Sequence, residues 1–132
     1  MGYLLDTHFV LWLLFDYKKI NPKIKTILEN RNNEIFISQI SLWEISLKYG
    51  LGKLDLYNSK PDEIQQILIL NGYKVLDLKS ENILSFYNLP QHIHKDPFDK
   101  MLVWQAIKSN LTLISQDKKL EVYQQNGLKI MY

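Results

Sequence analysis

The sequence predicts an α/β fold, a three-layer α/β/α sandwich with a central, mainly parallel sheet of about five strands. Short apolar runs alternate along the chain with longer segments that carry helix-start signals or helical periodicity. Strands that alternate with helices indicate a parallel sheet covered by helices on both faces. The length of 132 residues predicts one domain, residues 1–132, large enough to bury a core without disulfides.

The first part of the chain predicts a strand followed by two helices. Tyr3–Leu5 is a short apolar run that stops at Asp6 and is typical of a buried strand. Phe9–Phe15 is bulky and apolar, which indicates a helix packed against the sheet. Asn21-Pro22 is a cap and first-turn pair, so a second helix is expected from there to about Asn30.

A second strand and a longer helix follow. Glu34–Ser38, EIFIS, has the composition of a strand. The segment Gln39–Tyr49 carries apolar residues at helical spacing, which are expected to share one face: Ile40, Trp43 and Leu47. Gly50 and Gly52 are expected to end this helix.

The second half of the chain continues the alternation. Three helices are expected: Ile64–Leu70 after the start signal Ser59–Asp62, a short one from Ser80 to Leu89-Pro90, and one from Pro97 to about Ser109. Three further apolar runs are expected strands: Tyr73–Leu78, Leu111–Ser115 and Leu128–Tyr132. Asp6 and Asp117 each follow a strand directly, and sites in parallel sheets form at the carboxyl ends of the strands.

Composition excludes several classes of protein. No apolar run approaches the roughly 20 residues of a membrane span, and Asp6 interrupts an N-terminal apolar stretch that lacks a basic lead. The absence of cysteine excludes disulfides and zinc–thiolate sites, so a cytoplasmic protein is expected. The net charge of +2 permits nucleic-acid binding, but Arg31 is the only arginine, which argues against a site built on arginine forks.

The segment His92–Lys100, HIHKDPFDK, places two aspartates three residues apart. Asp96 is expected to cap a helix that begins at Pro97, and Asp99 would be its third residue, as in a capping box. Capping alone could explain both residues. Asp99, however, shares a helical face with three apolar residues: Leu102, Val103 and Ala106. Its carboxylate is therefore expected to point toward the sheet.

The other acids also have purely structural explanations. Asp6 could cap the helix after the first strand, and Asp117 could be a turn residue. Glu44 lies among apolar residues in SLWEISLK, where a buried glutamate needs a partner or a metal ion. It could instead lie on the solvent side and pair with Lys48 four residues on.

Carboxylates gathered at one edge of a sheet repel one another and raise each other's pKa values. A divalent cation removes that repulsion, and an all-oxygen set without cysteine favours Mg²⁺ or Mn²⁺. A water bound to such a cation is a nucleophile for phosphodiester hydrolysis. The sequence therefore predicts a metal-dependent nuclease with four catalytic, metal-ligating residues: Asp6, Glu44, Asp99 and Asp117.

Four blocks of the chain resemble PIN-domain ribonucleases, and most closely the VapC-type toxins. They are LLDTH at Leu4–His8, SLWEISLKYGLGKL at Ser41–Leu54, LPQHIHKDPFDKMLVWQA at Leu89–Ala106 and LISQD at Leu113–Asp117. They stand in the family's order, span nearly the whole chain, and the third is the specific one. The resemblance implies a PIN-like fold, an endoribonuclease that cuts RNA, the toxin role in a type II toxin–antitoxin pair, a homodimer, and an antitoxin that occludes the acidic site.

The resemblance also carries over residue by residue. The four acids match positions that bind one or two Mg²⁺ or Mn²⁺ ions, and Thr7 and Ser115 match supporting hydroxyls. Asp96 belongs to the extended motif of this branch and is expected to cap the helix at the edge of the site. Lys100 stands where the branch often has arginine, and KKL after Asp117 lacks a second acidic or asparagine position, which leaves the second metal ion open.

The remaining charged and aromatic residues have weaker signals. His92 and His94 could form an H-x-H-x-D metal site with Asp96, but a loop that contacts substrate phosphates is favoured because His8 is the only other histidine. The possible RNA-backbone contacts are Lys48, Lys53, His92, His94, Lys95 and Lys100. Core or dimer contacts are expected, in preference to base stacking, for Trp12, Trp43 and Trp104.

Two rival functions stay open. Asp6 could be the nucleophile of a phosphohydrolase, although such enzymes generally carry a second acid two residues on, where this chain has His8. A catalytically inactive PIN-like module that binds RNA or protein is the other rival. The presence of all four acids counts against it.

Overall fold

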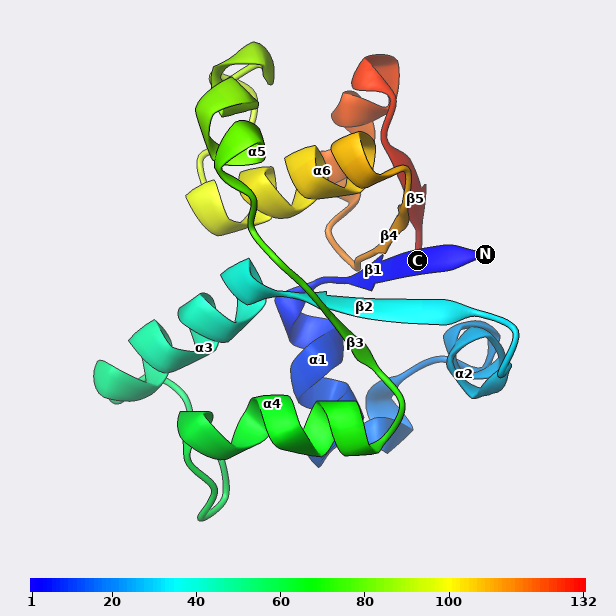
Figure 1. The fold of residues 1–132 in the computed structure, drawn as a ribbon, viewed down its shortest axis with the longest axis vertical. Helices are drawn as coiled ribbons and strands as arrows, with labels where there is room; N and C mark the ends of the chain where they lie inside the picture. Colours follow the sequence, from blue (N-terminus) through cyan, green and yellow to red (C-terminus); the bar gives the residue numbers. More distant parts are fainter.

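The computed structural model describes residues 1–132 and contains one five-stranded sheet with the strand order β3-β2-β1-β4-β5 (Figure 1). The strands are β1 (Gly2–Leu5), β2 (Glu34–Ser38), β3 (Lys74–Leu76), β4 (Thr112–Ile114) and β5 (Lys129–Met131). All neighbouring strands run parallel. The expected sandwich is confirmed, and the sheet is parallel throughout.

Helices cover both faces of this sheet. They are α1 (Thr7–Phe15), α2 (Pro22–Glu29), α3 (Gln39–Gly50), α4 (Pro61–Leu70), α5 (Ser80–Ser85) and α6 (Pro97–Ser109), with three 3₁₀ segments, η1 (Tyr17–Lys19), η2 (Phe86–Asn88) and η3 (Lys118–Asn126). In Figure 1, α5 and α6 lie on one side of the strands, and α1 and α4 lie on the other. None of the helices has the length and apolar character needed to cross a membrane.

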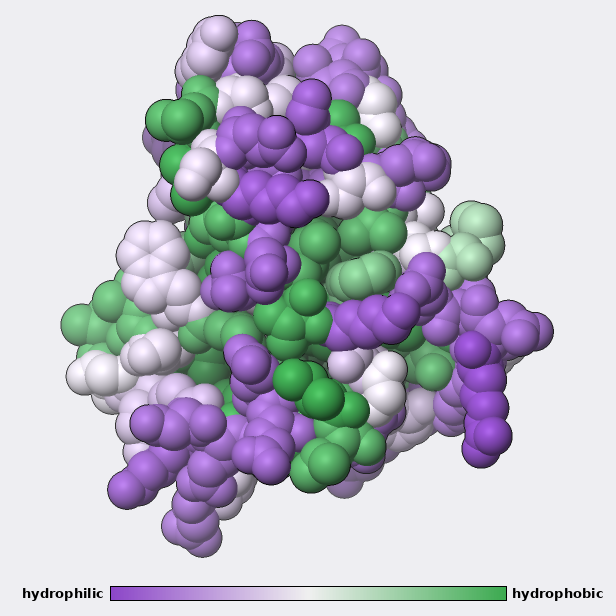
Figure 2. All heavy atoms as spheres, in the orientation of Figure 1, coloured by the Kyte–Doolittle hydropathy of each residue, from purple (hydrophilic) through white to green (hydrophobic).

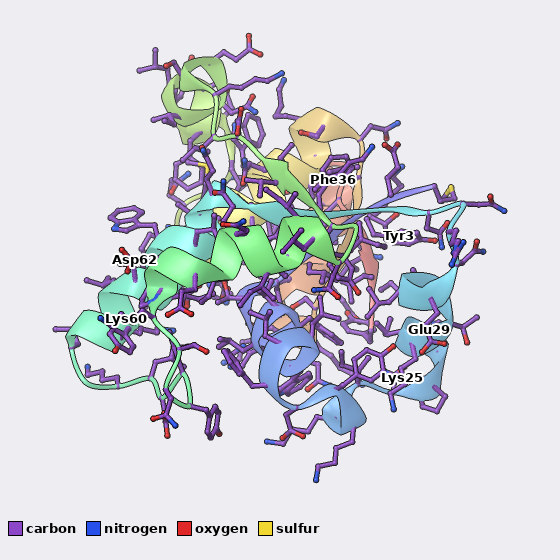
Figure 3. The ribbon with its side chains drawn as sticks, turned by 60° about the horizontal axis from the view of Figure 1, so that its bottom comes forward. Tyr3, Lys25, Glu29, Phe36, Lys60 and Asp62 are labelled. Carbon is purple, nitrogen blue, oxygen red and sulfur yellow. The ribbon has the colours of Figure 1, made fainter.

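The alternation of side chains along β1 divides the core in two. Leu5 belongs to a buried cluster with residues of α1, α2 and α4, whereas Leu4 belongs to a second cluster with residues of α6 and η3. Figure 3 shows the first layer from below, with α4 and α1 in front of the strands. Lys25 and Glu29 lie on α2 there, and Tyr17 of η1 donates a hydrogen bond to Glu29 (2.7 Å), which ties η1 to α2.

The register of the central strands brings functional positions to one edge. Leu5 of β1 pairs with Ile37 of β2 on one side and with Ile114 of β4 on the other. The residues that follow these strands therefore lie side by side at the carboxyl edge of the sheet. The N–H of Asp6 donates to the carbonyl of Ile114 (3.0 Å), which extends this pairing to the first residue beyond β1.

Helix-start signals located several elements well. Asn21 caps α2 by accepting a hydrogen bond from the N–H of Ile24 (2.9 Å), and α6 begins at Pro97 as expected. The strands β3, β4 and β5 are shorter than the apolar runs that predicted them. The segments η1 and η3 were not predicted, because a 3₁₀ turn has little periodic signal in sequence.

The apolar residues that share one face of α3 are not all buried. Of these three residues only Ile40 is buried, whereas Trp43 is 61% exposed and Leu47 is 42% exposed. The buried face also carries two polar residues, Ser41 and Glu44, because hydrogen bonds to Thr7 of α1 satisfy them. The helix also ends later than expected: Gly50 is still helical, and Gly52 follows in the left-handed region at φ 73°.

A buried polar clamp joins α6 to the sheet. Gln105 is fully buried, its Oε1 accepts a hydrogen bond from the hydroxyl of Ser38, and its Nε2 donates to the carbonyl of Asp77 (3.4 Å). Ser38 ends β2 and also caps α3 by accepting from the N–H of Ile40 (2.9 Å). One amide thus connects α6, the end of β2 and the segment after β3.

We predict that Gln105→Leu lowers the free energy of unfolding by about 1–3 kcal/mol, because it leaves the buried Ser38 hydroxyl and Asp77 carbonyl without their partner. Urea denaturation measures the change. Gln66→Leu, on the exposed side of α4, is the matched control and should change stability little. If the two variants were equally stable, the claim that the hydrogen bonds of Gln105 stabilise the fold would be contradicted.

Candidate metal centre

Asp6 lies at the carboxyl end of β1 and is the N-cap of α1. Its Oδ1 accepts a hydrogen bond from the N–H of Phe9 (3.0 Å), and the residue is 6% exposed. Burial raises the pKa of Asp6, and hydrogen bonds from Phe9 and from the Ser115 hydroxyl offset this only in part. The expected cap is therefore confirmed, but its carboxylate is also held in an environment that disfavours the charge.

Glu44 is buried on α3 and has a partner on each carboxylate oxygen. Oε1 accepts from the hydroxyl of Thr7 (2.6 Å), and Oε2 accepts from Nζ of Lys48 (2.5 Å). The hydroxyl of Ser41 lies 3.0 Å from that of Thr7. The pairing with Lys48 considered from sequence is present, but Glu44 is only 4% exposed and does not lie on the solvent side.

Asp96 and Asp99 occupy the start of α6. Asp96 is the cap, since its Oδ1 accepts from the N–H groups of Phe98 (2.9 Å) and Asp99 (3.4 Å). Asp99 points its carboxylate among other acids. Burial, followed by the charges of Asp96 and Glu44, raises the pKa of Asp99 to about 7.

Asp117 follows β4 and begins η3. Its Oδ1 accepts from the N–H of Lys119 (3.0 Å), and its own N–H donates to the hydroxyl of Ser115 (3.1 Å). Although burial raises the pKa of Asp117, hydrogen bonds from His94 and from the Lys119 N–H hold it below its ordinary value. Ser115 thus connects Asp6 with Asp117, which supports the expectation that its hydroxyl orders this edge.

An open cleft of about 500 Å³ contains three of the four predicted ligands. Its walls are formed by Asp6, His8, Trp12, Asp99, Gln116, Asp117 and Lys119. Glu44 lines a separate small hollow with Thr7 and Lys48. The charges of Glu44 and Asp6 both act on Asp99, so these three acids belong to one electrostatic system.

Some of the side chains predicted to contact the RNA backbone are bound to other protein groups, and others are exposed. Lys48 is bound to Glu44, and Nζ of Lys100 donates to Oε1 of Gln91 (3.1 Å). Exposed residues are Lys53, His92 and Lys95. His94 is not exposed: its Nε2 lies 3.0 Å from Oδ2 of Asp117 and 3.9 Å from Oδ2 of Asp99.

The three tryptophans differ in their surroundings. Trp104 is buried in the second core cluster, as expected. Trp43 is exposed and packs edge-on against Phe98, with ring centroids 5.2 Å apart. Trp12 packs against the first cluster and also lines the acidic cleft. Sequence reasoning missed Trp12, His8, Gln116 and Lys119 as cleft residues, and their positions next to Asp6 and Asp117 were the only signal.

The donor set fits a hard divalent cation. The candidate ligands are carboxylate oxygens, which Mg²⁺ and Mn²⁺ prefer. The raised pKa values of Asp6 and Asp99 show that this arrangement disfavours ionised carboxylates in the absence of a cation. Positive charge in the cleft would remove that penalty.

A sequence model of the PIN domain matches residues 3–125. The chain belongs to the PIN domain family. Its fold also matches solved toxin–antitoxin complexes: VapBC2 from Rickettsia felis bound to a promoter DNA fragment (TM-score 0.72, 21% identity, 99% of this chain and 98% of that chain) and DNA-bound VapBC from Salmonella typhimurium (0.68, 19%, 99% and 97%).

VapBC-1 from nontypeable Haemophilus influenzae is a third structural relative of this PIN domain, with a TM-score of 0.66 and 20% identity over 99% of this chain and 97% of that chain. No curated protein sequence matches the chain. At these identities the structural relatives establish the PIN fold.

We predict that Asp99→Asn stabilises the metal-free protein at pH 8 by up to about 4 kcal/mol, because folding raises the pKa of Asp99 from 3.8 to about 7. The folded protein keeps this proton between these two pH values whereas the unfolded chain loses it, so the wild type loses stability as pH rises through that window. Below pH 4 the two proteins should lose this difference.

Urea denaturation in EDTA at pH 4 and at pH 8 tests this dependence. Asp62→Asn, an exposed acid in the first turn of α4, is the control and should show no comparable gain. An Asp99→Asn protein that is no more stable than the wild type at pH 8 would show that neither burial nor neighbouring charge disfavours the ionised carboxylate.

Proposed function

We propose that this protein is a metal-dependent endoribonuclease, the VapC-type toxin of a type II toxin–antitoxin pair acting in the cytoplasm. The observation that carries the proposal is the cleft that gathers Asp6, Asp99 and Asp117 in a PIN domain, where burial and then neighbouring carboxylates raise the pKa of Asp99. An acid held in this way is suited to binding a cation and poorly suited to serving only as a helix cap.

In this proposal four residues ligate Mg²⁺ or Mn²⁺: Asp6, Glu44, Asp99 and Asp117. The cation would supply positive charge to the scissile RNA phosphate and lower the pKa of an attacking water. The protein's own contribution is to hold the ligands in place. Thr7 fixes one oxygen of Glu44, Ser115 connects Asp6 with Asp117, and Asp96 orders the first turn of α6 around Asp99.

Substrate binding is assigned to basic side chains outside the acidic cleft. The exposed side chains of Lys53, His92 and Lys95 are proposed phosphate contacts, together with Lys48 and Lys100. Exposed single-stranded RNA, such as a loop, suits an open cleft because its bases and backbone are accessible. Phosphate contacts of this kind would make binding fall steeply with salt.

Protein partners are proposed on two grounds. The structural relatives are VapBC complexes, which supports an antitoxin that covers the acidic cleft. The surface also exposes large apolar side chains that partners commonly bury, and Figure 2 shows apolar atoms over α4 and around α3. The largest on these two helices are Trp43, Leu47, Tyr49, Ile67, Ile69 and Leu70. A homodimer would cover part of this surface.

We predict discrete cleavage of cellular RNA by purified, antitoxin-free protein in Mn²⁺ or Mg²⁺, and no cleavage in EDTA. Asp6→Asn should reduce cleavage to the EDTA level because it removes a ligand charge at the carboxyl end of β1. Asp62→Asn, outside the cleft, should cut like the wild type. Sequencing of the cleaved ends identifies the target.

Two other outcomes would replace the proposal. If folded protein cuts no RNA with either metal and calorimetry detects no Mn²⁺ binding, the chain is a binding module. If acetyl phosphate leaves a labile acyl phosphate on Asp6, the chain is an aspartyl-nucleophile phosphohydrolase. The hydrogen bond from Phe9 to Asp6, which fixes that carboxylate as a cap, argues against the second outcome.

A further inference from the structure

His94 occupies the space between two carboxylates of the cleft. Its side chain is only 12% exposed, and its Nε2 lies 3.0 Å from Asp117 Oδ2 and 3.9 Å from Asp99 Oδ2. One ligand atom from each of the three residues falls within 4.8 Å of the others, close enough for all three to bind one metal ion. Two roles for His94 are therefore possible: a ligand of the cation, or a hydrogen-bond donor to Asp117.

The other ring nitrogen decides between these roles. The backbone N–H of Asp96 donates to Nδ1 of His94, with the two nitrogens 3.2 Å apart. A ring nitrogen that accepts a hydrogen bond carries no proton, so the proton of this imidazole is on Nε2. Nε2–H is then a donor, and the acceptor beside it is Asp117.

A metal-binding histidine has the opposite arrangement. The nitrogen that binds metal is unprotonated, and the other nitrogen donates its proton to a carboxylate, a carbonyl or water. Moving the proton of His94 to Nδ1 would point N–H against the N–H of Asp96. The backbone before α6 therefore favours the donor role.

The loop that carries His94 is held in place by its neighbours, which disfavours a flipped orientation of the ring. Asp96 is fixed because its side chain caps α6. Tyr123, fully buried on η3, donates its hydroxyl to the carbonyl of Pro90 (3.3 Å), at the start of this loop. The loop is thus attached both to α6 and to η3, the segment that begins at Asp117.

We propose that His94 is a positioning residue that orients Asp117 through Nε2–H and does not ligate the cation. Asp117 then has a donor on each oxygen, the Lys119 N–H on Oδ1 and His94 on Oδ2, which fixes its side chain at the cleft. The role in metal binding rests on the proposed nuclease function. The hydrogen bond and the position of the proton do not, so they can be tested separately.

The first test is ¹⁵N NMR of the imidazole in the intact, metal-free protein. The expected result is a His94 ring that is protonated at Nε2 and unprotonated at Nδ1. In Asp117→Asn, a scalar coupling or the chemical shift of the Nε2 group should change. A ring protonated at Nδ1 would overturn the proposal. This measurement needs no substrate and no nuclease activity, and its result holds even if the chain proves to be only a binding module.

The second test is electron paramagnetic resonance of the Mn²⁺-loaded protein with ¹⁴N- or ¹⁵N-labelled histidine. We expect no coupling of the strength that a directly bound nitrogen gives. A strong coupling that depends on the isotope and vanishes in His94→Ala would make His94 a ligand and overturn the proposal.

A pair of variants separates the two roles by Mn²⁺ affinity, measured by calorimetry. His94→Ala should weaken Mn²⁺ binding about 10- to 100-fold, as loss of a group that orients a ligand does. His94→Gln should recover most of the affinity because its amide N–H can reach Asp117. Asp62→Asn, an exposed acid outside the cleft, is the control and should leave Mn²⁺ affinity unchanged. An affinity unchanged in His94→Ala, or equal losses in the Ala and Gln variants, would contradict positioning by Nε2–H.

Discussion

Repulsion among carboxylates at the carboxyl edge of the sheet is the constraint on which the rest of the site depends. Burial and then the charges of Asp96, Glu44 and Asp6 raise the pKa of Asp99 to about 7, so this arrangement disfavours the ionised form. Holding these groups close together costs free energy that a fold with the groups farther apart would avoid. The surrounding structure supplies a hydrogen bond or a cation to three of the acids. Glu44 is matched by Thr7 and Lys48, Asp6 by the N-terminus of α1, and Asp117 by His94 and Lys119.

The parallel sheet makes this concentration of charge possible. Because β1, β2 and β4 are in register, the residues that follow them meet at one edge, where the helices α1 and α3 begin. The start of α6 comes to the same place from the opposite layer, and the buried amide of Gln105 helps to anchor that helix on the sheet. Helix N-termini favour negative charge, so those of α1 and α6 beside the cleft partly offset the repulsion. The fold therefore holds carboxylates close together in a partly buried cleft, at a cost that a cation would remove.

Much of this arrangement could be read from sequence because the signals were local. The cap at Asp96 with Pro97 located α6 to the residue, and the β-rich run EIFIS located β2. The buried face of α3 could not be found in this way, since hydropathy favoured Trp43 and Leu47 over Ser41 and Glu44. Those polar residues are buried because of partners on α1, which only the tertiary structure supplies. The four acids were proposed from motif and placement, whereas the cleft positions of Trp12, Gln116 and Lys119 depend on how loops meet. The orientation of the His94 ring depends on a backbone N–H and leaves no trace in the residue types.

The central claim is that the acids form one system that a divalent cation relieves. Calorimetric titration of the protein with Mn²⁺ near pH 7, in buffers of different ionisation enthalpy, tests it most directly because it counts protons released on binding. The account predicts saturable binding with release of a proton from Asp99. This release should disappear in Asp99→Asn. It should also become small at pH 9, where Asp99 is already ionised. Binding without proton release at pH 7, or no binding at all, would contradict the account.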